Sequence, residues 1–183
     1  MRMIRTASAF VPLVFCLAGA MSFANETSAS YAPVAFNVWA GLGVSYEHDS
    51  APSGSQSVAS ASFKLGADVG FRFSRQLSIV GLADYEILPS EPRDPALWVL
   101  MVGPGLRYQP DSLFQFTFAA GYVRTTLGIP GGLIGNGFGV RANAFLPLLA
   151  GFGPYAELGV DALRKGGVST QLVGLAVGIS YSF

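Results

Sequence analysis

Three consecutive residues, His48, Asp49 and Ser50, have the side chains of a hydrolytic triad, in which a base and an acid activate a nucleophile. A triad requires all three side chains to converge on one reacting atom, and consecutive residues cannot normally do so. Glu47 could join His48 and Asp49 in binding a metal only weakly, because this spacing is nonspecific. We therefore predict no catalytic residue, no metal and no cofactor, and we expect residues 47–57 to form a solvated polar loop.

A second set of residues with chemical potential is charged and recurs inside otherwise apolar segments. In residues 58–73, Lys64, Asp68 and Arg72 alternate with alanine, valine, leucine and phenylalanine. Because strand side chains alternate between faces, such a segment has one apolar face and one polar face. The same reasoning places nine charged residues on the polar faces of the predicted strands: Lys64, Asp68, Arg72, Asp84, Glu86, Arg107, Arg141, Glu157 and Asp161.

Eight predicted strands would position these charges. The chain is 51% hydrophobic and 12% charged with 23 glycines, a composition that favours strands over helices. After the N-terminal segment, no stretch of eighteen residues lacks a polar residue or glycine, which argues against helical membrane spans. Pro104 predicts a bulge or local break in the fourth strand. The predicted strands are residues 35–46, 58–73, 77–88, 96–108, 113–126, 137–146, 154–163 and 171–183.

The last predicted strand has the most regular pattern. Its large apolar residues include Val177, Ile179, Tyr181 and Phe183, and small residues lie between them over about eleven residues, enough to cross a bilayer as a tilted strand. In this pattern the sequence resembles small eight-stranded bacterial outer-membrane β-barrels, the class of the OmpA transmembrane domain and OmpX-like proteins. The resemblance implies that these four residues form the signal recognised by the barrel-assembly machinery.

The fold class that follows is all-β, an eight-stranded antiparallel up-and-down transmembrane β-barrel. A soluble sandwich or lipocalin-like barrel is the alternative, but sixteen alternating residues in 58–73 exceed the usual soluble strand. With an even number of strands, both ends of the barrel domain would be periplasmic. Residues 47–57, 89–95, 128–136 and 164–169 would then be extracellular connections.

The N-terminus predicts export across the inner membrane. Arg2 and Arg5 precede an apolar core at residues 7–21, and Ala24 ends a small-x-small cleavage site. We therefore predict a cleaved signal peptide at residues 1–24 and one barrel domain at residues 25–183, located in the outer membrane. A retained membrane anchor is the alternative. The sequence contains no basic patch that would indicate binding to nucleic acid.

The interior of an eight-stranded barrel is narrow enough for side chains to fill it. Counting from the turn at Arg75 places Lys64 opposite Glu86. Across the turn near Ala150, Arg141 falls within about two residues of Glu157 and Gly159. Paired charges can occupy such a lumen, whereas an isolated buried charge would be costly. We expect a largely plugged lumen, and a narrow pore for ions or small solutes is the alternative.

The exterior would contact outer-membrane lipid and lipopolysaccharide. Arg124 has outward parity, and with Arg164 and Lys165 it could reach lipopolysaccharide phosphates or remain a solvated rim charge. Aromatic residues near strand ends predict interfacial girdles, namely Tyr46, Tyr85, Trp98, Tyr108, Tyr122, Tyr181 and Phe183.

The resemblance implies a monomeric, non-enzymatic membrane protein with a structural or envelope-interaction role. A narrow pore is the first alternative. A lipid A-modifying enzyme that uses His48 is the second, because some barrels of this class act on lipid A through a histidine, a serine and an acid.

Overall fold

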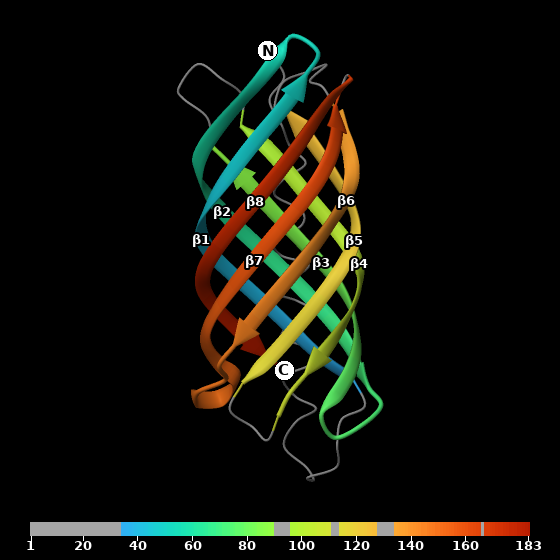
Figure 1. Ribbon diagram of the computed structural model, residues 1–183. Coiled ribbons are helices and arrows are strands. Elements are labelled where there is room, and N and C mark those ends of the chain that lie inside the picture. Colours follow the sequence, from blue (N-terminus) through green and yellow to red (C-terminus); the bar gives the residue numbers. More distant parts are fainter. Residues whose placement is uncertain (1–33, 90–95, 111–113, 128–133, 166) are drawn as a thin grey trace, which may run out of the picture. The chain divides into compact units, whose positions relative to one another are not determined.

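The described part of the chain folds into eight strands that close into one barrel. In the computed structural model, the described residues are 34–89, 96–110, 114–127, 134–165 and 167–183. Each strand pairs antiparallel with its neighbours in sequence, and β1 also pairs with β8, which closes the sheet (Figure 1). This confirms the predicted fold class. The strands are β1 (Val34–Ala51), β2 (Gly54–Arg72), β3 (Leu77–Leu88), β4 (Leu97–Tyr108), β5 (Gln115–Leu127), β6 (Ile134–Phe145), β7 (Phe152–Lys165) and β8 (Val168–Ser182).

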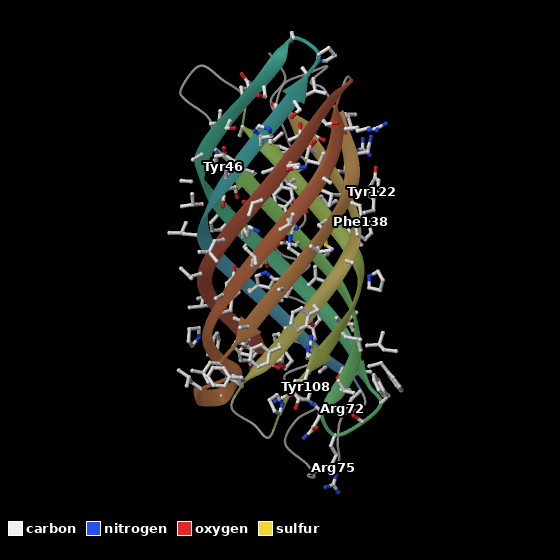
Figure 2. All side chains as sticks on the ribbon, in the orientation of Figure 1. Tyr46, Arg72, Arg75, Tyr108, Tyr122 and Phe138 are labelled. Carbon is white, nitrogen blue, oxygen red and sulfur yellow. The ribbon has the colours of Figure 1, made fainter. Side chains whose placement is uncertain are left out.

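The two faces of the barrel wall differ in chemistry. Along β3, successive side chains alternate between outward and buried positions, as a pleated strand requires. Large apolar side chains cover the outside, where Leu42 is 69% exposed, Phe118 60% and Ile179 65%. Figure 2 shows side chains projecting outward along the length of the wall. Lipid solvates an apolar surface of this extent and water does not, so the outer surface is that of a membrane-spanning barrel.

Aromatic residues lie toward both ends of this apolar surface. Tyr46 and Tyr122 lie toward one end of the barrel and Tyr108 toward the other, and all three are exposed (Figure 2). Trp98 is also exposed, and its ring packs edge-on against that of Tyr85 with centroids 6.3 Å apart. These positions agree with aromatic girdles at the two interfaces.

The prediction of a loop at residues 47–57 is wrong. β1 continues to Ala51 and β2 begins at Gly54, with His48 paired to Ser57, so that only two residues form the turn. Gly54 has a φ of 138°, a conformation that favours glycine. The serines and alanines of this segment indicate that it faces solvent, but they do not prevent the ladder from continuing.

Two further connections are shorter than predicted. Ile134 to Asn136 belong to β6, and the connection between β7 and β8 is reduced to residues 166 and 167. Gly167 has a φ of 87°, which suits such a tight turn. Residues 90–95 and 128–133, which belong to two other predicted connections, and the predicted signal peptide at 1–24 lie outside the described residues.

Pro104 interrupts pairing on one side of β4 only. On the β3 side it pairs with Gly81, so the ladder there is continuous. On the β5 side pairing lapses between Val102 and Gly105 and resumes in the same register. Proline has no N–H to donate, which explains the lapse. The unchanged register corrects the prediction of a bulge, whereas the predicted local break is present on the β5 side.

A short 3-10 turn, η1 (Leu149–Gly151), connects β6 to β7. Among the described residues, no helix has the length and hydropathy needed to cross a membrane.

Candidate functional site

Six charged side chains meet inside the barrel, brought there by the inward positions of β2, β3, β6 and β7. We call this set the central network: Lys64, Asp84, Glu86, Arg141, Glu157 and Asp161. Each is at most 3% exposed. Lys64 pairs with Glu86 in the β2–β3 ladder, which is the register expected from the sequence. The other partners come from strands that are distant in sequence.

Lys64 contacts three carboxylates. Its Nζ donates to Glu157 Oε1 at 2.6 Å and lies 3.5 Å from Glu86 Oε2 and 3.9 Å from Asp84 Oδ2. Glu86 also accepts a hydrogen bond from the Ser45 hydroxyl. One ammonium group therefore connects β2, β3 and β7 across the interior.

Arg141 makes the second centre of the network. Its guanidinium binds Asp161 through two parallel hydrogen bonds, Nη1 to Oδ1 at 2.5 Å and Nη2 to Oδ2 at 3.0 Å. Its Nε donates to Asp84 Oδ2 at 2.8 Å. Gly159, opposite Arg141 in the ladder, leaves space beside the guanidinium, because a Cβ there would lie 3.1 Å from Nη1. The planar fork of arginine suits this bidentate arrangement.

The network holds more anions than cations. It contains two basic and four acidic side chains, and Asp84 Oδ1 and Glu157 Oε2 have no hydrogen-bond partner among the described residues. Electrostatic attraction to the two cations is therefore shared among competing carboxylates. Removing either cation would leave several buried negative charges without compensation.

The remaining predicted inner charges lie apart from the central network. Arg107 Nη2 donates to Asp68, and both side chains are buried. Arg72 is partly exposed near the end of β2, where its Nη2 lies 3.5 Å from Gln109 Oε1 (Figure 2). Of the nine predicted inner charges, the structure thus brings six into one network and two into a separate pair.

The interior also contains many apolar side chains that sequence reasoning missed. Val99, Met101 and Val123 are completely buried, and Leu97, Leu163 and Leu172 lie with Thr125, Thr170 and Glu47 around a crevice that leaves no room for the centre of a water molecule. A sequence signal existed: residues 97–102 are apolar at both parities, a pattern typical of strands buried on both faces.

His48 does not assemble a triad. Its Nδ1 lies 2.7 Å from Ser57 Oγ and its Nε2 lies 3.3 Å from Ser50 Oγ. Asp49 has the opposite parity and accepts a hydrogen bond from Thr170, so it does not orient the imidazole. In the part of the chain that the structure describes, no group of three or more histidine, cysteine, aspartate or glutamate residues is arranged to bind a metal.

The residues predicted for assembly and lipid contact lie mostly on the outside. Val177 and Ile179 are exposed, and Tyr181 packs against Phe152 with ring centroids 4.2 Å apart. Phe183 follows β8 as the last residue. Arg124 and Arg164 are exposed, whereas the side chain of Lys165 lies outside the described part of the chain.

Comparison with solved structures finds similar proteins at low sequence identity. Neisserial surface protein A has 16% sequence identity and a TM-score of 0.55, with 81% of this chain and 99% of that chain covered. Ail of Yersinia pestis has 12% identity and a TM-score of 0.47, covering 80% and 98%. OprG of Pseudomonas aeruginosa has 12% identity and a TM-score of 0.46, covering 81% and 95%. No family model and no curated protein sequence matches this chain.

The likeness to Neisserial surface protein A concerns the fold. This shared fold, the apolar exterior and the buried charges together indicate an integral β-barrel protein of the outer membrane. This agrees with the predicted location.

Proposed function

We propose that this outer-membrane barrel is a closed, non-conducting protein with a structural or envelope-interaction role. The observation that carries this proposal is the burial of the inward side chains: Lys64, Val99, Met101 and Val123 are 0% exposed. Side chains that line a water-filled pore would be accessible to water along its length. Their burial supports a lumen filled by the protein itself.

The central network favours a lumen that stays closed. Opening a path past Lys64 would separate it from Glu157, whose contact is at 2.6 Å. It would also separate Arg141 from Asp84 on β3 and from Asp161 on β7. Breaking a buried ion pair leaves charges without compensation and costs about 3–5 kcal/mol. The apolar side chains packed between the same strands add to this cost.

We assign the hairpin turns β1–β2, β3–β4, β5–β6 and β7–β8 to the outside of the cell and the first residues of β1 to the periplasm. The even number of strands supports this assignment, because it places the first and last strand ends on the same side of the membrane. Asn37 pairs with Ser182, so these two ends lie together. We also assign the assembly signal to Val177, Ile179, Tyr181 and Phe183, and we propose a monomer that contacts lipid.

The decisive measurement is single-channel conductance of the refolded protein in a planar bilayer. Folding is first verified by the heat-dependent gel shift that is typical of intact barrels. We expect no unitary steps from folded protein. Stable, discrete steps would contradict the closed barrel.

The narrow pore is the second candidate, favoured by the position of Lys64 within 4 Å of three carboxylates. The Lys64 ammonium group could move from one of these carboxylates to another without becoming unpaired. If steps are observed, Lys64→Gln or Arg141→Gln should change their conductance. Unaltered conductance in both variants would show that ions do not pass through the central network.

We propose no enzymatic activity, because His48 contacts two serines and lacks the orienting carboxylate of a triad. The test is the lipid A mass spectrum of cells with and without the protein. We expect identical spectra. A new species that disappears in His48→Ala would establish the lipid A-modifying alternative.

A further inference from the structure

Three polar side chains form one outward row across β5, β6 and β7. Arg124 pairs with Asn136, and Asn136 pairs with Arg164 on its other side. All three are exposed on the outer face of the barrel. Neighbouring strands lie about 4.8 Å apart, so the backbones of the two arginines are about 10 Å apart. Flexible arginine side chains at this separation can approach a single headgroup.

The row lies at the edge of the apolar exterior. Two residues further from the strand ends, Tyr122 and Phe138 pair with each other and are both exposed. Figure 2 shows these two residues toward the end of the barrel that is opposite Arg75. The guanidinium groups therefore lie next to the boundary between hydrocarbon and headgroups, where lipid phosphates are found.

The charges of this row are not compensated within the described protein. No carboxylate of the described residues forms an ion pair with Arg124 or Arg164. The Tyr122 hydroxyl donates to Asn136 Oδ1, which orients the amide so that its nitrogen is a further donor. Outward cations on a barrel destabilise it when they face hydrocarbon, and the cost falls toward the interface. A ligand that is both anionic and membrane-bound would offset the part of this energetic cost that remains at the interface.

We propose that Arg124, Asn136 and Arg164 bind the phosphate groups of a phosphorylated, lipid A-type lipid in the outer leaflet. Guanidinium groups bind phosphate through paired, charge-assisted hydrogen bonds. Acyl chains of the same lipid would lie along Tyr122 and Phe138, which a free phosphate cannot use. The assignment to the outer leaflet rests on the proposed orientation of the barrel. The recognition of phosphate by these residues does not depend on that orientation.

The test measures binding to the refolded protein in detergent by native mass spectrometry. The probes are lipid A with its phosphates, the same lipid after enzymatic removal of the phosphates, and inorganic phosphate as competitor. The variant is Arg124→Gln/Arg164→Gln, and the matched control is Arg75→Gln, which removes an exposed arginine at the opposite end of the barrel. Each protein is first tested for the heat-dependent gel shift.

We expect the double variant to bind phosphorylated lipid A about tenfold or more weakly than wild type, as the loss of charge-assisted hydrogen bonds implies. Arg75→Gln should bind as wild type does, and the dephosphorylated lipid should not distinguish the three proteins. If the double variant does not fold, Arg124→Gln and Arg164→Gln are tested singly, each with a smaller loss expected.

Unchanged affinity in these variants, or equal wild-type affinity for both lipids, would overturn the proposal. Displacement of the lipid by equimolar inorganic phosphate would show that the site binds free phosphate, and the lipid assignment would then be wrong. Conductance and lipid binding are measured independently. Unitary conductance steps from a protein that still binds lipid A would therefore contradict the closed lumen and leave the lipid-binding proposal standing.

Discussion

Replacement of Lys64 by methionine should destabilise the barrel more than any surface substitution. Methionine keeps much of the length of lysine but removes its charge. Lys64 Nζ lies 2.6, 3.5 and 3.9 Å from oxygens of Glu157, Glu86 and Asp84. At an effective dielectric constant of about 20, these separations correspond to attractions of about 6, 5 and 4 kcal/mol.

Most of this attraction offsets the desolvation of the buried ions and the repulsion among the carboxylates. The expected net loss is therefore that of a broken buried ion pair, about 3–5 kcal/mol in the free energy of unfolding. The remaining network would hold four carboxylates and one cation, Arg141. Adding Glu157→Gln to Lys64→Met should recover part of the loss, because it removes one of the uncompensated anions.

The assay is urea unfolding of the protein refolded into lipid vesicles, followed by tryptophan fluorescence and by the heat-dependent gel shift. Arg75→Met is the matched control: Arg75 is exposed in the turn after β2, so a change within about 0.5 kcal/mol is expected. A loss below about 1 kcal/mol for Lys64→Met would refute the view that this network holds the interior together.

Three further predictions concern other parts of the interior and the wall. Glu157→Gln should cost less stability than Asp161→Asn, because one oxygen of Glu157 has no partner among the described residues whereas both oxygens of Asp161 bind a guanidinium; urea unfolding compares them. Gly66→Ala should destabilise by about 1–3 kcal/mol, since its Cβ would overlap the indole ring of Trp39. A brominated lipid should quench the fluorescence of Trp98, which is exposed to lipid, and leave that of buried Trp39 nearly unchanged, as single-tryptophan variants would show.

Each of these has an outcome that contradicts it. Gly81→Ala is the control for Gly66→Ala, because a Cβ at Gly81 would meet its nearest neighbour only at 4.0 Å. Equal losses in the two alanine variants would contradict the steric argument. Equal quenching of the two tryptophans would contradict the assignment of inner and outer faces. A larger loss for Glu157→Gln than for Asp161→Asn would contradict the argument from their hydrogen-bond partners.

Much of the fold could be predicted because a membrane barrel imposes a period of two on its sequence. The terminal strand and the alternation around Lys64 and Asp68 gave the fold class and, by counting from a turn, the pairing of Lys64 with Glu86. Local pattern and turn position suffice for neighbours in one hairpin.

Other features depend on information that a local pattern does not contain. The contact of Lys64 with Glu157 joins residues separated by 93 positions and exists only once the barrel closes. The apolar inner residues of β4, such as Val99 and Met101, were missed because both faces of that strand are apolar. The length of the first hairpin was missed because its residues are small and polar. Such residues indicate exposure to water, but they do not indicate whether the backbone is paired as a strand.

The wide sequence separation within the central network has a consequence for biogenesis. Asp84 and Glu86 are on β3, whereas Arg141, which binds Asp84, is on β6. An intermediate with only β1 to β4 inserted would therefore carry these two carboxylates into hydrocarbon with Lys64 as their only cation from the network. Unpaired strand edges would add to this penalty. Insertion one hairpin at a time is therefore disfavoured, and the late strands must join the early ones before the charged layer crosses the bilayer. The ion pairs thus couple translocation to completion of the sheet.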